Sequence, residues 1–162
     1  MSKPVATIGV YGFTLDDFLA ALRSADVRLL LDVRQRRGVR GPEYAWANSK
    51  RLQAALAKAE VEYRHLPELA PTTELRQLQY AEDDRQGVGK GSRTELAPAY
   101  RDGYLAEILD KADLGAVVAS LPEAGAAALL CVERDPEACH RSLIAERLAS
   151  DHDVEVTHLR PS

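Results

Sequence analysis

The sequence predicts an α/β fold: a three-layer sandwich with a mostly parallel sheet of about five strands. Short apolar runs alternate along the chain with segments whose apolar residues recur at helical spacing. The first two runs, 5–10 and 27–33, are joined by one such helical segment with short connections. This arrangement is typical of a βαβ unit, whose strands are parallel.

The elements of the first half follow from local signals. Thr14 is expected to cap the first helix, because Asp17 follows three positions later as in a capping box. Asn48 or Ser49 is expected to cap the second helix. Alternation of apolar and polar residues at 61–66 predicts a third strand nearer the edge of the sheet.

Residues 67–97 interrupt this regular order, because they are too many for an ordinary connection in a compact domain. We predict a short helix at 73–78 and a mobile, glycine-rich segment at 82–93. The excursion serves either as a lid or partner-binding segment, or as a solvated surface loop.

The last third returns to the α/β pattern. Proline is favoured in the first turn of a helix, so Pro98 is expected to open one. The remaining predicted elements are a helix or strand at 114–121, a strand at 126–132, a helix at 142–149 and a strand at 154–158.

Composition and length narrow the classes of protein. A chain of 162 residues suits one domain, here 1–162, and 46% apolar with 28% charged residues is ordinary for a soluble protein. The net charge of −4 gives no general electrostatic reason to bind nucleic acid or an anionic membrane. No run has the length of a membrane span and no secretory leader is apparent, so we expect a cytoplasmic protein. Nothing indicates a cofactor, and the oligomeric state is left open.

The predicted topology also predicts where a ligand binds. In an open parallel sheet, ligands bind beyond the carboxyl ends of the strands. Polar side chains follow several of the predicted strands there, and we expect them to converge. From the first and third strands these ligand-binding candidates are Tyr11, His65 and Glu68.

The stretch 131–142 concentrates the most reactive side chains at the end of the fourth strand. Cys131 and Glu133 should point to the same face, because side chains alternate along a strand. Glu133 is a candidate general base or an ion-pair partner, and Cys131 is expected in the core.

The role of Cys139 depends on where the following helix begins. With Asp135 as N-cap and Pro136 first in the helix, Cys139 lies one turn inside it. If 135–138 form a turn instead, Cys139 lies at the positive helix end, which favours a thiolate and an anion. His140 would then be a catalytic neighbour and Arg141 a clamp for phosphate or carboxylate. Alternatively, Cys139 is a small core residue and His140 a structural hydrogen-bonding group.

A basic loop, 34–40, follows the second strand and carries four arginines. Arg34 and Arg37 are candidate phosphate ligands, because guanidinium groups match phosphate oxygens. The alternative is a solvated loop. Tyr44 and Trp46 just beyond it could stack on a base or cover the core, and core packing is expected for Trp46.

Two familiar motifs are rejected. The glycine-rich run 87–92 lacks the Ser or Thr that follows Gly-Lys in a phosphate-binding loop, and follows no strand. Cys131 and Cys139 are too far apart in sequence for a two-cysteine zinc knuckle. Cys139 and His140 could bind a metal together with one distant histidine, but we expect no metal site.

Five segments, 7–9, 32–34, 65–69, 131–133 and 139–142, carry a family resemblance, together with the motifs RRGVRG at 36–41 and YAxANS at 44–49. On the five segments the chain resembles a family of bacterial and archaeal proteins catalogued as domain of unknown function 488. On the two motifs it resembles one branch of that family. The resemblance covers nearly the whole chain and implies an α/β three-layer fold, but no settled activity.

Three hypotheses of function follow. The first is an enzyme acting on a phosphate-bearing small molecule or nucleotide, with nucleic acid allowed and no membrane partner. In it, Arg34, Arg37 and Arg141 hold the anion while Glu133, Cys139 and His140 form the reacting centre. The second is a non-catalytic module that binds nucleic acid or protein through the basic loop. The third is a thiol or metal protein centred on Cys139.

Overall fold

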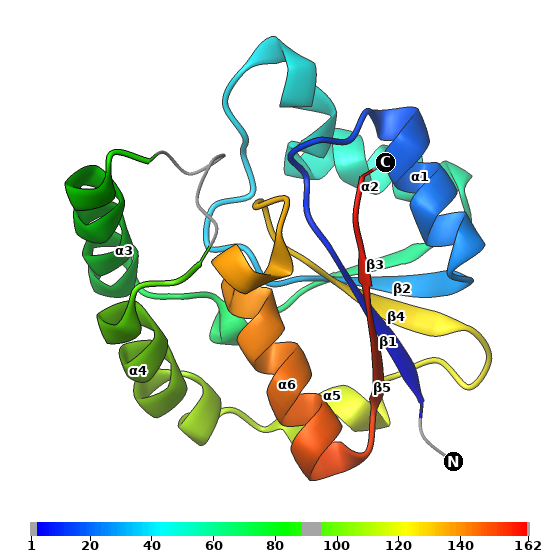
Figure 1. Cartoon of the computed structure of the whole chain (residues 1–162). Coiled ribbons are helices and arrows are strands. Elements are labelled where there is room, and N and C mark those ends of the chain that lie inside the picture. Colours follow the sequence, from blue (N-terminus) through cyan, green and yellow to red (C-terminus); the bar gives the residue numbers. More distant parts are fainter. Residues whose placement is uncertain (1–2, 89–94, 162) are drawn as a thin grey trace.

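The computed structural model describes residues 3–88 and 95–161. Its centre is a five-stranded sheet with every strand parallel, in the order β3-β2-β4-β1-β5 (Figure 1). The predicted α/β fold with a mostly parallel sheet of five strands is therefore confirmed. The strands are β1 (Pro4–Ile8), β2 (Val27–Asp32), β3 (Glu62–His65), β4 (Ala126–Leu130) and β5 (Glu155–Leu159).

The path of the chain sets the layers. From β1 the chain passes through α1 (Leu15–Ser24) to β2, and then through α2 (Ser49–Lys58) to β3 at one edge. From β4 it runs the opposite way, through α6 (His140–His152), to β5 at the other edge. Right-handed crossovers in opposite directions cover opposite faces, so α1 and α2 lie on one face and α6 on the other (Figure 1).

The direction of winding reverses between β1 and β4, which are neighbours in the sheet. Beyond the carboxyl ends of two such strands the outgoing chains separate toward opposite faces, which opens a crevice. Ligands of open α/β sheets bind at this switch point. The topology therefore predicts a ligand-binding site near the residues that follow β1 and β4.

The α6 face carries three further helices, which pack on one another rather than singly on the sheet. The helix α3 contacts α4, and both α4 and α5 contact α6. Short 3₁₀ turns complete the structure at Pro42–Ala47, Pro67–Leu69, Leu109–Lys111 and Pro136–Ala138. The three helices are α3 (Thr73–Gln86), α4 (Pro98–Glu107) and α5 (Leu114–Ala119).

Helix starts agree with the cap predictions, with one variation. The Thr14 hydroxyl accepts a hydrogen bond from the Asp17 amide at 3.2 Å, and Pro98 opens α4. Asn48 stands at the N-cap of α2, but its Oδ1 accepts from the Val39 amide at 2.7 Å instead of capping. Asn48 therefore anchors the basic loop to the start of α2.

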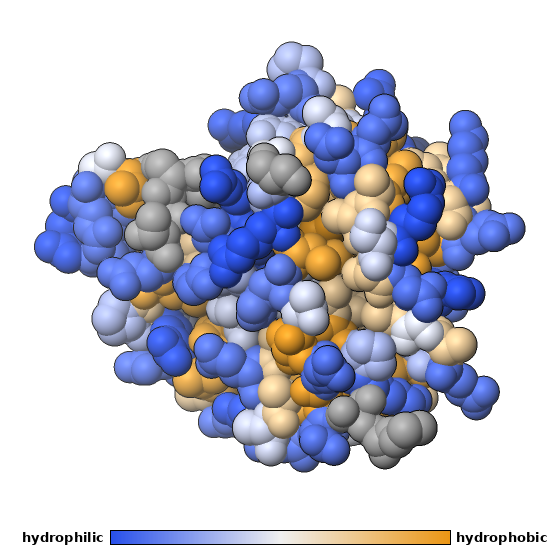
Figure 2. All heavy atoms as spheres, turned by 45° about the vertical axis from the view of Figure 1, so that its right-hand side comes forward, coloured by the Kyte–Doolittle hydropathy of each residue, from blue (hydrophilic) through white to orange (hydrophobic). Residues whose placement is uncertain are grey.

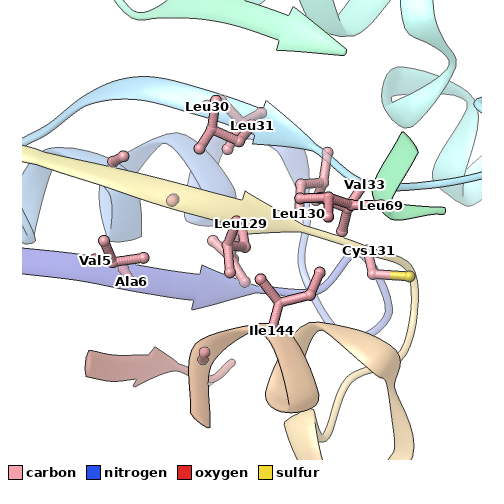
Figure 3. Close-up of a cluster of buried hydrophobic side chains, with 14 of the residues drawn as sticks. Val5, Ala6, Leu30, Leu31, Val33, Leu69, Leu129, Leu130, Cys131 and Ile144 are labelled. Atoms are coloured by element: carbon pink, nitrogen blue, oxygen red, sulfur yellow. The ribbon is translucent and has the colours of Figure 1, made fainter. Parts of the chain in front are cut away.

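The core is built around β4, whose five residues are all buried because neighbouring strands and helices cover it on every side. In Figure 3, Leu129 and Leu130 lie between Leu31 of β2 and Ile144 of α6, and Cys131 continues the same cluster just beyond the arrowhead. Cys131 is 6% exposed, as the core prediction expected.

The predicted short helix and mobile segment in 67–97 are partly wrong. Helix α3 runs from the Thr72 cap to Gly87, whose φ of 72° ends it, so residues 82–86 are helical. The prediction failed because the buried face of α3 continues with polar side chains. Gln79 donates to Asp83 at 2.8 Å and accepts from the Ala97 amide at 2.8 Å. Residues 89–93 of the predicted mobile segment, which include most of the run 87–92, lie outside the described residues.

The structure also defines the type of one predicted element and the start of another. Residues 114–119 form a helix rather than a strand, and α6 begins at His140, two residues before the predicted start.

On the face in Figure 2, hydrophilic side chains surround a smaller apolar area. Within the described parts of the chain, no helix combines the length and apolarity that a membrane crossing requires.

Candidate functional site

The exits of β1 and β4 are bound together where the winding reverses. The amides of Val10 and Tyr11 both donate to the Val132 carbonyl, at 2.9 and 3.0 Å. A Cβ atom on Gly9 would lie 1.9 Å from the Glu133 carbonyl oxygen, so only glycine permits this approach. The backbone of 131–133 is thereby held against β1.

The turn after β4 settles which helix start is correct. Pro136–Ala138 form a 3₁₀ turn, and Cys139 follows with extended backbone (φ −138°, ψ 148°) as the N-cap of α6. The helix begins at His140, as in the second of the two predicted arrangements. Cys139 is only 1% exposed, and its side chain does not cap the helix. The turn instead folds the Cys139 side chain back toward β4.

Two thiols and one imidazole meet in this fold-back. His140 Nδ1 lies 3.6 Å from Cys131 Sγ and 3.8 Å from Cys139 Sγ. On the other side of the ring, Nε2 lies 2.8 Å from the Val33 carbonyl oxygen, and the Tyr104 ring lies 5.4 Å away. A carbonyl can only accept, so the proton is on Nε2, and in the neutral ring the Nδ1 lone pair faces the sulfurs.

The three groups influence each other's protonation. Burial raises the pKa of Cys131 well above its ordinary value, and the neighbouring Cys139 sulfur adds to the effect. Burial acts the same way on Cys139, but the Cys131 thiol and the charges of His140 and Arg141 outweigh it, so the pKa of Cys139 is well below ordinary. Burial would lower the pKa of His140, yet the Cys139 charge raises it. Of the two thiols, Cys139 is therefore the one that loses its proton first.

Glu133 is the acidic member of the centre. Its Oε2 accepts from the Cys131 thiol at 3.5 Å, which confirms that both side chains point to the same face. It is 6% exposed, and it lines the pocket described below. A carboxylate in this position can exchange a proton with a ligand in the pocket.

Arg141, predicted as an anion clamp, is occupied internally. It is fully buried, and its two terminal nitrogens donate to the carbonyls of Glu133 (2.7 Å) and Arg134 (3.1 Å). Its guanidinium holds the 131–135 turn in shape, and it does not line the pocket. Its Nε is also buried and has no hydrogen-bond partner among the residues that the structure describes. These contacts give Arg141 a positioning role, and the predicted anion clamp stays a prediction.

Arg34 likewise makes internal contacts. It is 1% exposed and grips the buried Asp32 carboxylate through Nε and Nη2, at 2.9 and 2.8 Å, while Nη1 donates to the Ala47 carbonyl at 2.9 Å. Arg37 donates to Ser49 Oγ (3.1 Å) and Tyr63 OH (3.3 Å). These contacts stabilise the loop, and both Arg37 bonds come from Nη1 alone. Arg34 also lines the pocket described below, whereas Arg37 does not. The phosphate contacts of the two arginines stay a prediction.

Of the other predicted ligand residues, one lines the pocket and two do not. Tyr11 lines the pocket, where its ring lies 5.1 Å from Tyr44. His65 contacts the Arg34 carbonyl at 3.0 Å and Glu68 is exposed, and neither lines the pocket. Trp46 is partly buried against Phe18, with ring centroids 5.0 Å apart, as expected for core packing.

A pocket of about 590 Å³ opens over the carboxyl ends of β2 and β4. Cys131, Glu133 and His140 contribute to its floor, and Cys139 lies behind them. Its walls come from the basic loop and from α3 and α4. The wall residues include Arg36, Arg40, Arg76, Gln79, Tyr80 and Tyr100.

The α3 and α4 contributions were missed from sequence. Arg76 donates to Gln35 Oε1 at 2.5 Å and to the Tyr80 hydroxyl at 2.7 Å, which joins α3 to the basic loop. The spacing of Arg76 and Tyr80 by four residues places them on one helical face, and this was the available signal.

Comparison with known proteins supplies a family but no activity. No curated protein and no solved structure matched the chain. The model of one protein family matches residues 14–148, which span most of the chain. This range contains every member of the centre at 131–141, whereas Tyr11 of the pocket lies just before it. The chain therefore belongs to the family described as domain of unknown function DUF488.

Proposed function

We propose that the chain is an enzyme acting on a phosphate-bearing small molecule or nucleotide in the pocket at the carboxyl edge of the sheet. The observation that carries the proposal is one pocket with cationic walls and an ionisable floor. Arg36, Arg40 and Arg76 line the walls, whereas Glu133 is the only carboxylate among the described lining residues. A volume of about 590 Å³ suits a ligand of this size.

The charge of this pocket contrasts with that of the whole chain. The net charge is −4, so arginines gathered in one concave surface act locally on a ligand rather than as a general attraction. Arg34 adds little to the field, because the Asp32 carboxylate neutralises it at 2.8 Å. The three wall arginines are the anion ligands we now propose, ahead of Arg34, Arg37 and Arg141.

Aromatic side chains favour a nucleotide over a simple phosphate ester. Tyr11, Tyr80 and Tyr100 line the pocket, and a tyrosine ring offers a flat surface to a base. Glu133 at the floor would handle protons during the reaction, and His140 would line the centre beside it. We place this activity in the cytoplasm, where Cys131 and Cys139 stay reduced.

Titration calorimetry with pyrophosphate, AMP and ATP tests the binding. Wild type should bind at least one of them, with an affinity that falls as salt rises. Arg36→Gln and Arg40→Gln should each weaken binding about tenfold, which corresponds to about 1.4 kcal/mol. Arg51→Gln is the matched control, because Arg51 is exposed on α2 and outside the pocket. No binding by wild type, or an equal loss in the control, would contradict the proposal.

A second arm separates an enzyme from a non-catalytic binding module. The ligands bound by wild type are incubated with the protein and followed by phosphorus NMR. We expect Glu133→Gln to keep its affinity while turnover falls by about a hundredfold or more, because a general acid or base contributes about that much. Binding without turnover by wild type would favour the module.

A further inference from the structure

The two cysteines and the histidine form a set of metal-ligand atoms that the mechanism above leaves unexplained. Cys131 Sγ, Cys139 Sγ and His140 Nδ1 all lie within 4.8 Å of one another. Within residues 3–88 and 95–161 this is the one group of three or more potential ligands that meets so closely. All three side chains are buried, so the set is part of the fold rather than a chance surface cluster.

The distances fit a tetrahedral zinc ion. Zinc binds thiolate sulfur at about 2.3 Å and imidazole nitrogen at about 2.0–2.1 Å, so a tetrahedral angle separates the sulfur from the nitrogen by about 3.6 Å. The observed separations between His140 Nδ1 and the two sulfurs are 3.6 and 3.8 Å. The two nitrogen–sulfur separations therefore already match those of a tetrahedral zinc site.

The histidine is also held as a metal ligand usually is. Its Nε2 donates to the Val33 carbonyl oxygen at 2.8 Å, which fixes the ring and leaves Nδ1 directed at the sulfurs. A backbone carbonyl on the second ring nitrogen is a common support for metal-bound histidine. The buried side chain of Tyr104 packs on the same ring.

Three ligands leave a fourth coordination position. Cys131 and His140 line the pocket and Cys139 does not, so we place the open position toward the pocket. Glu133, 3.5 Å from Cys131 Sγ, stands beside it. Three protein ligands with one open position are typical of a catalytic zinc site, and closed sets of four are typical of structural ones.

We propose that Cys131, Cys139 and His140 bind one zinc ion whose open position faces the anion pocket, with Glu133 next to that position. The zinc site stands on its own geometry, and only its role toward a substrate rests on the proposed function. Bound there, zinc would supply a Lewis acid for a phosphate oxygen or a bound water.

The test uses the full chain, reduced and freed of metal by a chelator. Zinc is then added in competition with a chromophoric chelator. Wild type should take up one zinc per chain, and Cys139→Ser and His140→Gln should weaken binding at least a hundredfold. His152→Gln is the matched control on the same helix, remote from the sulfurs, and should bind as wild type does. Circular dichroism shows whether each variant is folded.

The outcomes are distinct. Reduced wild type that leaves all zinc with the chelator overturns the inference without any variant. Variants that bind as tightly as wild type also overturn it. If the protein binds zinc but none of the phosphate compounds, only the proposed function is contradicted. If it binds a nucleotide but no zinc, only the metal site is contradicted.

Discussion

The imidazole of His140 donates from Nε2 to the carbonyl oxygen of Val33 at 2.8 Å. This bond joins the first residue of α6 to the end of β2, 107 positions earlier in the chain. It sets the ring so that Nδ1 faces both sulfurs, and it brings the exits of β2 and β4 to one centre. The chemistry of the site therefore depends on the packing of the whole sheet edge.

Gly9→Ala should destabilise the protein and disturb the site. The added Cβ would lie 1.9 Å from the Glu133 carbonyl oxygen, so the β4 exit would have to move. We expect a loss of about 2–3 kcal/mol in the free energy of unfolding, measured in urea. In Gly38→Ala the nearest atom would be 3.7 Å away, so this control should change stability by less than about 0.5 kcal/mol. Equal losses in the two variants would contradict the packing described.

Asp32→Asn should be among the most damaging polar substitutions. It leaves the buried Arg34 guanidinium, now 2.8 Å from the Asp32 carboxylate, without a counter-charge. Breaking a buried pair in this way costs about 3–5 kcal/mol. Tyr63→Phe removes the 2.6 Å hydrogen bond to the same carboxylate and the 3.3 Å bond from Arg37, but no charge, and should cost about 1–2 kcal/mol. A smaller loss in Asp32→Asn than in Tyr63→Phe would refute this ranking.

Gln79→Ala tests how α3 is fixed to the start of α4. The Gln79 carbonyl accepts from the buried Ala97 amide at 2.8 Å, and its loss deprives that amide of this partner. We expect a loss of about 1–3 kcal/mol in the free energy of unfolding. Gln77→Ala, at an exposed position on the same helix, is the control and should be close to neutral. The comparison fails if both variants unfold alike.

Alkaline pH should destabilise the fold through its buried tyrosines. Burial raises the pKa of Tyr100 and Tyr104 well above the ordinary value of a tyrosine. In the unfolded chain they lose their protons near pH 10, whereas the folded chain keeps them. Their contribution is thus fully present below about pH 10 and is lost as pH rises toward the folded pKa. The free energy of unfolding should fall by about 1.4 kcal/mol per pH unit for each such group.

Tyr100→Phe provides the control for this effect. Its stability should decline less steeply above pH 10 than that of wild type, while the two curves run parallel between pH 7 and 9. Absorbance of the tyrosinate ion, followed with unfolding, shows whether the two processes coincide. Ionisation of Tyr100 in the folded protein near pH 10 would contradict the burial described.

The fold was predictable because its signals are local. Apolar runs and helical periodicity gave the strands, and the glycine and proline positions gave most boundaries. The length of α3 was not predictable in this way, because Gln79 and Asp83 on its buried face are hydrogen-bonded polar residues. A hydropathy pattern does not distinguish such residues from solvated ones.

The location of the site could be predicted from the sequence, but the contacts of its side chains could not. The sheet rule selected Glu133, Cys139 and His140, and the structure brings them together. Arg34 and Arg141 looked like free cations, since their buried partners, the Asp32 carboxylate and the turn carbonyls, appear only in three dimensions. Cys131 and Cys139, eight residues apart, match no metal motif, and only the turn at Pro136–Ala138 brings them to one histidine.

X-ray absorption at the zinc edge of the reduced, zinc-loaded protein tests the central claim most directly. We predict two sulfur neighbours at about 2.3 Å and imidazole nitrogen at about 2.0–2.1 Å, with a lighter atom completing the four. In Cys139→Ser one sulfur should disappear. A spectrum with only nitrogen and oxygen neighbours, or with one sulfur in wild type, would contradict a centre formed by Cys131, Cys139 and His140.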